Sequence, residues 1–381
     1  MIPFNKPYLH GRELVYIAQA VATGKISGDG HFTSLCHRFF EGKYHFKKVL
    51  MTTSCTDALE MAAILLNIQQ DDEVIAPSYT FVSTVNAFAL RGANIIFADS
   101  YSEHPNVDPA QIEKLITSKT KAIVVVHYAG VACDMDAIMS IANKYNVPVV
   151  EDAAQAIDGY YKGKPLGSIG TFGTFSFHET KNIIAGEGGL LAINDERYID
   201  RAEIIREKGT NRSSFFRGEV AKYGWVDIGS SFLPSDIIAA YLYAQLENMD
   251  AIQARRKAIW QRYYDKLSHS LVGAGIAVPT VVDYATNNAH MFYLVCKNIE
   301  QRSALIQHLK NSGVHAVFHY LSLHASEFYQ GKHQGDALPN SDRFTDTLVR
   351  LPLFYELEDQ QVDYICEQIL NYVSTENAAG D

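Results

Sequence analysis

A short run of small hydroxyl residues could bind a phosphate group. Residues 53–56, with the sequence TSCT, follow an apolar run and lead into a helix predicted to begin near Asp57. Small residues at a helix N-terminus leave backbone N–H groups free at the positive end of the helix dipole, an arrangement that binds phosphate. Capping of the helix by Thr53 or Ser54 explains the same residues without a ligand.

Two further segments carry an acid and a base. Asp152 comes directly after an apolar run, in the sequence VVEDAAQA. An ionised carboxylate there can hold a buried cation, such as a protonated ring nitrogen, or can simply cap the chain that follows. Lys181 lies between Ser176 and the glycine-rich residues 186–189. A lysine whose amine is neutral part of the time can form a Schiff base, although most lysines are solvated. The phosphate site, the acid and the amine together are the set that pyridoxal phosphate requires.

Alternating apolar runs and helical segments indicate the fold that would position these groups. Short runs without polar alternation occur at 48–51, 74–76, 94–98, 122–127 and 148–151. Strands of this kind are buried on both faces, which is typical of a mostly parallel sheet covered by helices. In such a sheet, ligands bind at the carboxyl ends of the strands. The predicted fold class is therefore α/β.

The second half of the chain has a different pattern. Runs at 174–177 and 189–194 have no long helix between them and are expected to form a hairpin or adjacent strands. Helices are predicted at 11–22, 196–208, 235–268 (long and kinked), 302–311 and 360–372, and strands at 291–296 and 315–320. We therefore predict a large α/β domain with an N-terminal helix over residues 1–250, a smaller α+β domain over 251–373, and a flexible tail over 374–381.

The amino-acid composition argues against two classes of partner. Lys and Arg number 33 against 43 Asp and Glu, giving a formal net charge of −10, which argues against nucleic acid and membrane as partners. No apolar run approaches the roughly 20 residues of a membrane helix, and the N-terminus lacks the apolar core of a signal peptide. The five cysteines form no CxxC pair, and His178-Glu179 lacks the second histidine of an HExxH metal site because residue 182 is Asn. We expect a cytoplasmic protein without a metal.

Four motifs resemble, in order, those of the sugar-nucleotide aminotransferases, a family of fold-type-I pyridoxal-phosphate enzymes. They are SCTDALEMA from residue 54, PSYTFVST from 77, VVEDAAQA from 149 and FSFHETKN from 175, the last followed by GEGG. The resemblance extends over nearly the whole chain. It implies the fold-type-I transferase fold, pyridoxal 5'-phosphate as cofactor, and a homodimer with sites at the subunit interface.

The resemblance also implies roles for individual residues. Lys181 would be the Schiff-base lysine and proton shuttle, and Asp152 would keep the pyridine nitrogen protonated. Gln155 would bond the phenolic oxygen of the ring, and Phe81 would stack on its face. The phosphate would be bound at the helix start and the end of a neighbouring strand, by Ser54, Cys55, Thr56 and Ser176.

One segment departs from the family pattern. Where most members carry Asn and Arg, this chain reads GSSFLPSD from residue 229, with Ser231 and Leu233 in place of those residues. In the family, a polar side chain of this segment reaches the phosphate bound by the other subunit. The resemblance implies that Ser231 makes this contact.

Other segments bear on the substrates. REKGTNRSSFFRGEVAKYGW from residue 206 and VFHYLSLH from residue 317 are most similar to the family branch that aminates dTDP-4-keto-6-deoxyhexoses. That similarity implies L-glutamate as donor and a dTDP-4-amino-4,6-dideoxyhexose of galacto configuration as product, for polysaccharides such as enterobacterial common antigen and O-antigen.

Candidate residues for substrate binding lie in the same two segments. Residues 201–222 contain six basic and three acidic side chains, so Lys208, Arg212 and Arg217 are candidates for the diphosphate. An exposed helix and loop with alternating charge is the alternative. His319 and Tyr320 are candidates for contact with the sugar, and a packed aromatic strand is the alternative there.

Three other functions stay open at this point. The amine could be delivered to C3 of the sugar. A sister branch that removes the C3 hydroxyl, as a dehydratase, has histidine at the lysine position, so Lys181 favours transamination. A non-catalytic, ligand-sensing regulator on the same fold would have no need of a proton shuttle.

Overall fold

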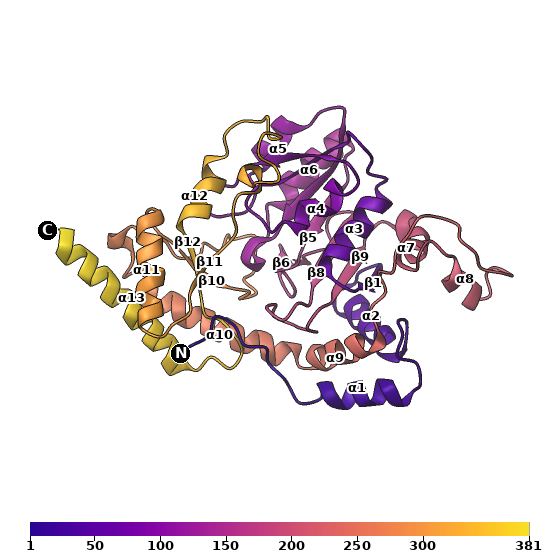
Figure 1. The fold of residues 1–381 in the computed structure, drawn as a ribbon, viewed down its shortest axis with the longest axis horizontal. Helices are drawn as coiled ribbons and strands as arrows, with labels where there is room; N and C mark the ends of the chain where they lie inside the picture. The colour runs from indigo at the N-terminus through magenta and orange to yellow at the C-terminus, as the bar shows by residue number, and fades with distance from the viewer. Residues whose placement is uncertain (381) are drawn as a thin grey trace.

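The computed structural model describes residues 1–380, and their side chains as far as Thr375. Its large sheet has seven strands in the order β1-β9-β8-β5-β4-β2-β3 (Figure 1). The strands are β1 Lys48–Thr52, β2 Glu73–Pro77, β3 Asn94–Ala98, β4 Thr120–Val126, β5 Val149–Asp152, β8 Phe172–Ser176 and β9 Gly189–Ile193. Only β9 in this sheet is antiparallel to its neighbours, so the carboxyl ends of the other six lie at one edge. The predicted mostly parallel α/β sheet is confirmed.

Side chains of these strands are buried on both faces of the sheet. On β4, Ile123 and Val125 belong to one hydrophobic core, whereas Ala122 and Val124 belong to the core on the opposite face. All four are at most 1% exposed. Because both faces must be apolar, the strands have continuous apolar sequences rather than alternating ones.

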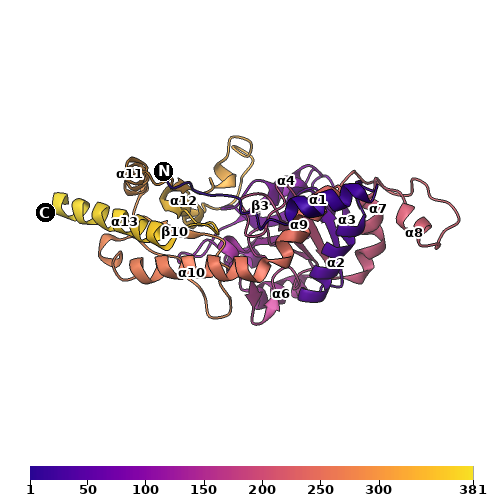
Figure 2. The same ribbon diagram turned by 90° about the horizontal axis from the view of Figure 1, so that it is seen from below.

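Helices cover both faces. The core that contains Val124 is completed by α3 Cys55–Leu65, α4 Ser83–Ala89 and α7 Ile199–Arg206. The core that contains Val125 is completed by α1 Glu13–Ala22, α2 His31–Tyr44, α5 Pro109–Leu115, α6 Met135–Tyr145 and α9 Asp236–Glu247. A short helix, α8 Arg212–Phe216, extends away from the body (Figure 2). A two-stranded hairpin, β6 Tyr160–Tyr161 and β7 Lys164–Pro165, is separate from the large sheet.

The C-terminal part of the chain forms a smaller antiparallel sheet with its own core. Its strand order is β10-β12-β11, with β10 Phe292–Val295, β11 Val317–Phe318 and β12 Leu348–Leu351. The helices around it are α10 Met249–Leu267, α11 Ile299–Asn311, α12 Pro339–Thr347 and α13 Asp359–Gly380. Alternate residues of β12 face opposite ways: Val349 packs among these helices, whereas Leu348 packs against Tyr79 and Tyr128 of the large domain.

Two segments join the domains. Helix α10 contributes Ile252 to the core of the large domain and Ile259 and Tyr263 to that of the small domain. Ile2, at the N-terminus, forms a bridge with Val314 and is buried in the small-domain core. Residues on both sides of position 250 therefore contribute to both cores.

The structure differs from the predicted elements in several places. The predicted long, kinked helix over 235–268 is interrupted at Asn248, whose backbone (φ −106°, ψ 9°) is not helical, so the kink divides it into two helices. Helices α2 and α12 and strand β12 were not predicted. Where a flexible tail was predicted over 374–381, α13 continues to Gly380, and Asp381 lies outside the described residues. Over the described part of the chain, each helix is too short or too polar to cross a bilayer.

Candidate active site

A cavity of about 940 Å³ lies between the two domains, at the edge of the large sheet where the parallel strands end. The three chemically suggestive segments of the large domain all contribute to its wall, through Ser54–Thr56, Asp152 and Lys181. The small domain contributes Tyr320 and Arg350. The fold therefore brings together groups that are more than 100 residues apart in the sequence.

The N-terminus of α3 presents unpaired backbone donors to this cavity. Ser54 caps the helix, and its Oγ accepts a hydrogen bond from the N–H of Asp57 at 3.1 Å. Within the described residues, the N–H groups of Cys55 and Thr56 have no acceptor. β9 starts so close that a Cβ on Gly189 would lie 2.2 Å from the carbonyl carbon of Ser54. The capping interpretation thus holds for Ser54, while the next two N–H groups stay free for an anion.

Asp152 ends β5 and is 6% exposed. Its Oδ2 accepts a hydrogen bond from the Thr84 hydroxyl at 2.7 Å, and its Oδ1 accepts one from the N–H of Ala154 at 3.1 Å. Because the Thr84 hydroxyl proton points at Asp152, the contact of 2.8 Å between Thr80 and Thr84 has Thr80 as donor. Burial raises the pKa of Asp152, although these hydrogen bonds and the charge of Lys181 oppose the rise. A cation placed against this carboxylate would favour its ionised form.

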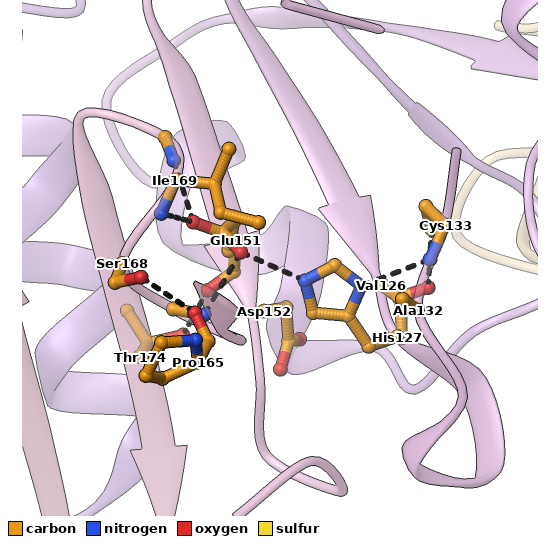
Figure 3. Close-up of polar contacts among 12 residues, drawn as sticks. Val126, His127, Ala132, Cys133, Glu151, Asp152, Pro165, Ser168, Ile169 and Thr174 are labelled. Atoms are coloured by element: carbon orange, nitrogen blue, oxygen red, sulfur yellow. Dashed lines mark hydrogen bonds and ion pairs between the residues drawn. The ribbon is translucent and has the colours of Figure 1, made fainter. Parts of the chain in front are cut away.

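The preceding residue, Glu151, has a complete set of partners on the opposite face of β5 (Figure 3). Its carboxylate accepts hydrogen bonds from the N–H groups of Gly167, Ile169 and Gly170 at 2.6–2.8 Å, and contacts Nε2 of His127 at 2.9 Å. Nδ1 of His127 accepts a hydrogen bond from the N–H of Cys133 at 3.2 Å. Nε2 therefore carries the ring proton and donates a hydrogen bond to Glu151. Glu151 therefore anchors the loop before β8 and has no part in the cavity wall.

Lys181 lies in the loop between β8 and β9, and its side chain lines the cavity. The loop is held by the next residue, Asn182, whose Nδ2 donates to Oε1 of Gln253 on α10 at 2.8 Å and to the carbonyl of Asn288 at 2.9 Å. Burial lowers the pKa of the Lys181 amine, and the positive charge of Arg350 lowers it further, whereas Cys55 and Asp152 oppose this shift. The amine is therefore neutral more often than that of a solvated lysine.

Other predicted residues surround the same space. The Gln155 side chain accepts from the N–H of Ala129 at 2.6 Å and donates to the hydroxyl of Tyr320 at 3.0 Å. Phe81 is 54% exposed, and its ring centroid is 6.0 Å from that of Tyr320. Ser176 is the last residue of β8 and lines the cavity.

His319 also lines the cavity but is bound within an aromatic cluster. Its Nδ1 contacts the hydroxyl of Tyr128 at 2.6 Å, and its carbonyl accepts from the hydroxyl of Tyr79 at 2.7 Å. Burial lowers the pKa of His319 well below its usual value. Tyr320 stacks on it with ring centroids 3.5 Å apart and has a φ of +37°. The predicted strand over 315–320 ends at Phe318 for this reason, and Tyr320 rather than His319 has its polar atom near Gln155.

The predicted phosphate-binding residues of the 201–222 segment do not line the cavity of their own chain. Arg212 pairs with Glu207 at 3.0 Å, and Arg217 pairs with Glu203 and Glu219, each at 2.7 Å. These pairs fit the alternative of alternating surface charge. Lys208, the third candidate for the diphosphate, is likewise absent from the wall. Ser231, which was predicted to reach the cofactor phosphate of the other subunit, is absent from it too.

Several residues of the site were not predicted from the sequence. Thr84, which holds Asp152, is the last residue of the motif PSYTFVST, but no role was assigned to it. His290 and Phe4, which line the cavity, carry no distinctive pattern. Arg350 does carry a signal, because it is the one charged residue of the apolar run LVRLPLF at 348–354. A single charge in a buried strand needs a partner or a function.

These groups fit pyridoxal phosphate. Two unpaired N–H groups at a helix start suit its phosphate, the buried carboxylate of Asp152 suits a protonated ring nitrogen, and the amine of Lys181 suits its aldehyde. The cavity also leaves room for a second molecule.

Comparisons with known proteins agree with this fit. The model of the DegT/DnrJ/EryC1/StrS aminotransferase family matches residues 7–370. Protein MJ1066 of Methanocaldococcus jannaschii, which is uncharacterised, is 32% identical over 339 residues, which is 86% of either chain. The aminotransferase TlmJ from Streptoalloteichus hindustanus superposes with a TM-score of 0.91 at 27% identity, covering 99% of this chain and 100% of its own.

A further solved structure bears on the cofactor. Spr1654 from Streptococcus pneumoniae, assigned as a sugar aminotransferase, superposes in its PMP form with a TM-score of 0.90 at 26% identity, covering 98% of this chain and 100% of its own. The same protein has been solved in a PLP form. The predicted fold-type-I fold and the predicted cofactor are confirmed.

Proposed function

This chain belongs to the DegT/DnrJ/EryC1/StrS aminotransferase family and is a pyridoxal-phosphate-dependent sugar aminotransferase, and we propose that it transfers the amino group of L-glutamate to C4 of a dTDP-linked 4-keto-6-deoxyhexose. The product would be a dTDP-4-amino-4,6-dideoxyhexose of galacto configuration, for cell-surface polysaccharide synthesis. The observation that carries the proposal is that Lys181, Asp152 and the start of α3 meet in one cavity. The choice of sugar is supported by the similarity of segments 206–225 and 317–324 to one branch of the family.

Lys181 moves the proton in this proposal. Bound pyridoxal phosphate supplies an aldehyde carbon that binds amines, and a ring that takes up the electron pair left when a proton is removed. Lys181 takes the proton from Cα of the donor and returns it at C4′ of the cofactor, and the reverse steps deliver the amine to the sugar. Because one amine acts as base and then as acid, its pKa should lie near the working pH. Burial lowers the pKa of Lys181 in that direction.

The other residues of the wall orient the reacting groups. The Asp152 carboxylate, held by Thr84, keeps the ring nitrogen protonated. The N–H groups of Cys55 and Thr56, with the side chains of Ser54, Thr56 and Ser176, hold the phosphate. Gln155 would bond the phenolic oxygen of the ring, and Phe81 would cover its face. Tyr320 would touch the sugar, with His319 stacked on it.

We further propose a cytoplasmic homodimer whose sites lie at the subunit interface. Ser231, Lys208, Arg212 and Arg217 do not line the cavity of their own chain. Trp225, in the same segment, is 82% exposed, as expected for a surface that a second copy covers. In that arrangement Ser231 would reach the partner's phosphate and the basic residues its nucleotide diphosphate. Light scattering on the purified protein tests this, and an active monomer would contradict it.

The reaction is tested by incubating the purified protein with L-glutamate and a panel of dTDP-linked keto sugars. NMR of the product should show an axial amine at C4 and equimolar 2-oxoglutarate. An amine at C3 would move the assignment to the other position of the sugar. Release of water without consumption of glutamate would indicate a dehydratase, and binding of sugar without uptake of the cofactor would indicate a regulator.

A further inference from the structure

Arg350 is a half-buried cation that has no counter-ion among the residues that the structure describes. It lies on β12, the central strand of the small sheet, directly opposite Tyr293 of β10. Its Nε is buried without a hydrogen-bond partner, and its guanidinium forms no ion pair with any residue that the structure describes. The same guanidinium lines the cavity. A charge that has lost its water and gained no partner is unfavourable unless a ligand supplies the missing group.

Arg256, which is fully buried in the same region, has a structural role. Arg256 on α10 donates from Nε to the carbonyl of Ala289 at 3.1 Å and from Nη2 to that of His290 at 2.7 Å. These bonds tie α10 to the segment before β10. Within the described part of the chain no such bond is seen for Arg350, so its position is not explained by anchoring.

The surroundings of Arg350 select the kind of group that could pair with it. Its guanidinium lies over the ring of Phe4, 4.6 Å from the centroid. The ionisable groups that interact with it include the phenols of Tyr79, Tyr128 and Tyr320. The amine of Lys181 and the imidazoles of His290 and His319 interact with it as well. These neighbours are aromatic and offer no carboxylate, and Arg350 lines the cavity beside them. A guanidinium in such a setting binds a carboxylate through two parallel hydrogen bonds.

We infer that Arg350 binds the α-carboxylate of the amino-acid donor, an inference that rests on the proposed function. The donor carries its carboxylate on the carbon from which Lys181 takes the proton, so the group that holds this anion must lie close to Lys181. Arg350 meets this condition, since both residues line one cavity and interact electrostatically. The cofactor phosphate has its own site at the start of α3, on the other domain. The nucleotide diphosphate is attached at C1 of the sugar, across the ring from the reacting C4.

Donor binding would then also prepare the base. While Arg350 is unpaired, its charge lowers the pKa of Lys181. A carboxylate bound to Arg350 cancels that charge, so the amine becomes more basic when it has to accept the proton from Cα.

The first test measures binding without turnover. Calorimetry with glutarate compares the wild type with Arg350→Gln, Arg350→Lys and the control Arg302→Gln. Arg302 is a fair control because its Nε is also unpartnered, yet its guanidinium lies over Phe318 and it does not line the cavity. We expect Arg350→Gln to weaken glutarate binding roughly 10- to 100-fold, Arg350→Lys to weaken it less, and Arg302→Gln to leave it unchanged. Equal binding by the wild type and Arg350→Gln would overturn the inference.

The second test separates the two half-reactions. With the loaded enzyme, Arg350→Gln should raise the KM for L-glutamate by a similar factor and leave the half-reaction with the dTDP-keto sugar unchanged. 4-Aminobutyrate, which is glutamate without the α-carboxylate, should react equally with the wild type and Arg350→Gln. A loss confined to the sugar half-reaction would overturn the carboxylate assignment and indicate the diphosphate. If the wild type aminates no sugar while glutarate binding still depends on Arg350, the proposed function fails and the anion site stands.

Discussion

Glu151 and Asp152 are adjacent carboxylates that are buried on opposite faces of β5, and they differ in what surrounds them. Glu151 receives hydrogen bonds from three backbone N–H groups and from His127. Asp152 receives two, and its remaining acceptor capacity faces the cavity. Arg256 and Arg350 repeat the contrast among cations. A buried charge with all its partners fixes the structure, whereas one with too few partners marks the place of a ligand.

The largest effect on turnover is expected when the base on the cavity side, Lys181, is removed. Lys181→Ala should lower turnover by about 10³-fold or more, because no other amine can carry the proton, and should leave the melting temperature nearly unchanged. Steady-state kinetics and thermal unfolding measure the two effects. Lys119→Ala, at an exposed site, is the control. Normal turnover by Lys181→Ala would remove Lys181 from the mechanism.

Asp152→Asn tests the under-bonded carboxylate. The loss of its negative charge should lower turnover by roughly 10²- to 10³-fold, because the ring nitrogen would no longer be held protonated where charge develops. The absorption spectrum of the bound cofactor should change with it, and circular dichroism should report an intact fold. If the Asp152→Asn protein unfolds instead, this residue belongs with Glu151 as a structural group.

Glu151→Gln tests the carboxylate whose hydrogen-bond partners are all in place. An amide cannot accept hydrogen bonds from three backbone N–H groups and His127 as a carboxylate does, so we expect unfolding to become easier by about 3 kcal/mol. Denaturant unfolding of the purified variant measures this. The fraction that remains folded should keep a near-normal kcat. A variant as stable as the wild type but inactive would reverse the roles assigned to the two carboxylates.

A smaller effect is expected from Thr84→Val, which removes the hydroxyl that holds Asp152 but keeps the shape of the side chain. Turnover should fall about tenfold, and the pKa of Asp152 in the cofactor-free protein should rise, because the hydroxyl no longer stabilises the ionised carboxylate. Thr84→Ser should restore both. If the serine variant behaves like the valine variant, packing rather than the hydrogen bond is the contribution of Thr84.

The smallest expected effect is on the way the stability of the cofactor-free protein changes with pH. Burial raises the pKa of Asp152, so above the unfolded value of about 4 the folded state binds more protons than the unfolded state, and stability is lost as pH rises. Asp152→Asn should abolish this part of the loss, so the melting temperatures of the two proteins should diverge as pH rises from about 4. Parallel curves would show that Asp152 titrates normally.

Local patterns were enough to predict much of the large domain. The strands that carry Asp152 and Ser176 are continuous apolar runs, and this property follows from burial on both faces. Helix α2 was missed although Phe32, Cys36 and Phe40 recur every four residues and are buried, because the intervening histidines and glycine obscure the pattern. Strand β12 was missed because Pro352 follows it directly.

The limits of sequence reasoning are clearest for the charged residues. The basic excess in residues 201–222 suggested an anion site, but Arg217 is paired with Glu203 and Glu219. Arg350 gave a weaker local signal, yet it lines the cavity and forms no ion pair with any residue that the structure describes. Which cation has a partner depends on contacts between residues far apart in the sequence, and composition over a short window does not report them.

Helix α10 has a mechanical consequence. Through Gln253 it bonds to Asn182, the neighbour of Lys181, and through Arg256 it bonds to the segment that begins the small sheet. Both contacts come from one continuous helix, Met249–Leu267, so α10 connects the loop that carries Lys181 with the start of the small sheet. An inserted residue or a proline in the middle of α10 would therefore lower turnover without changing any side chain of the cavity, because it would shift the small-domain residues relative to Lys181.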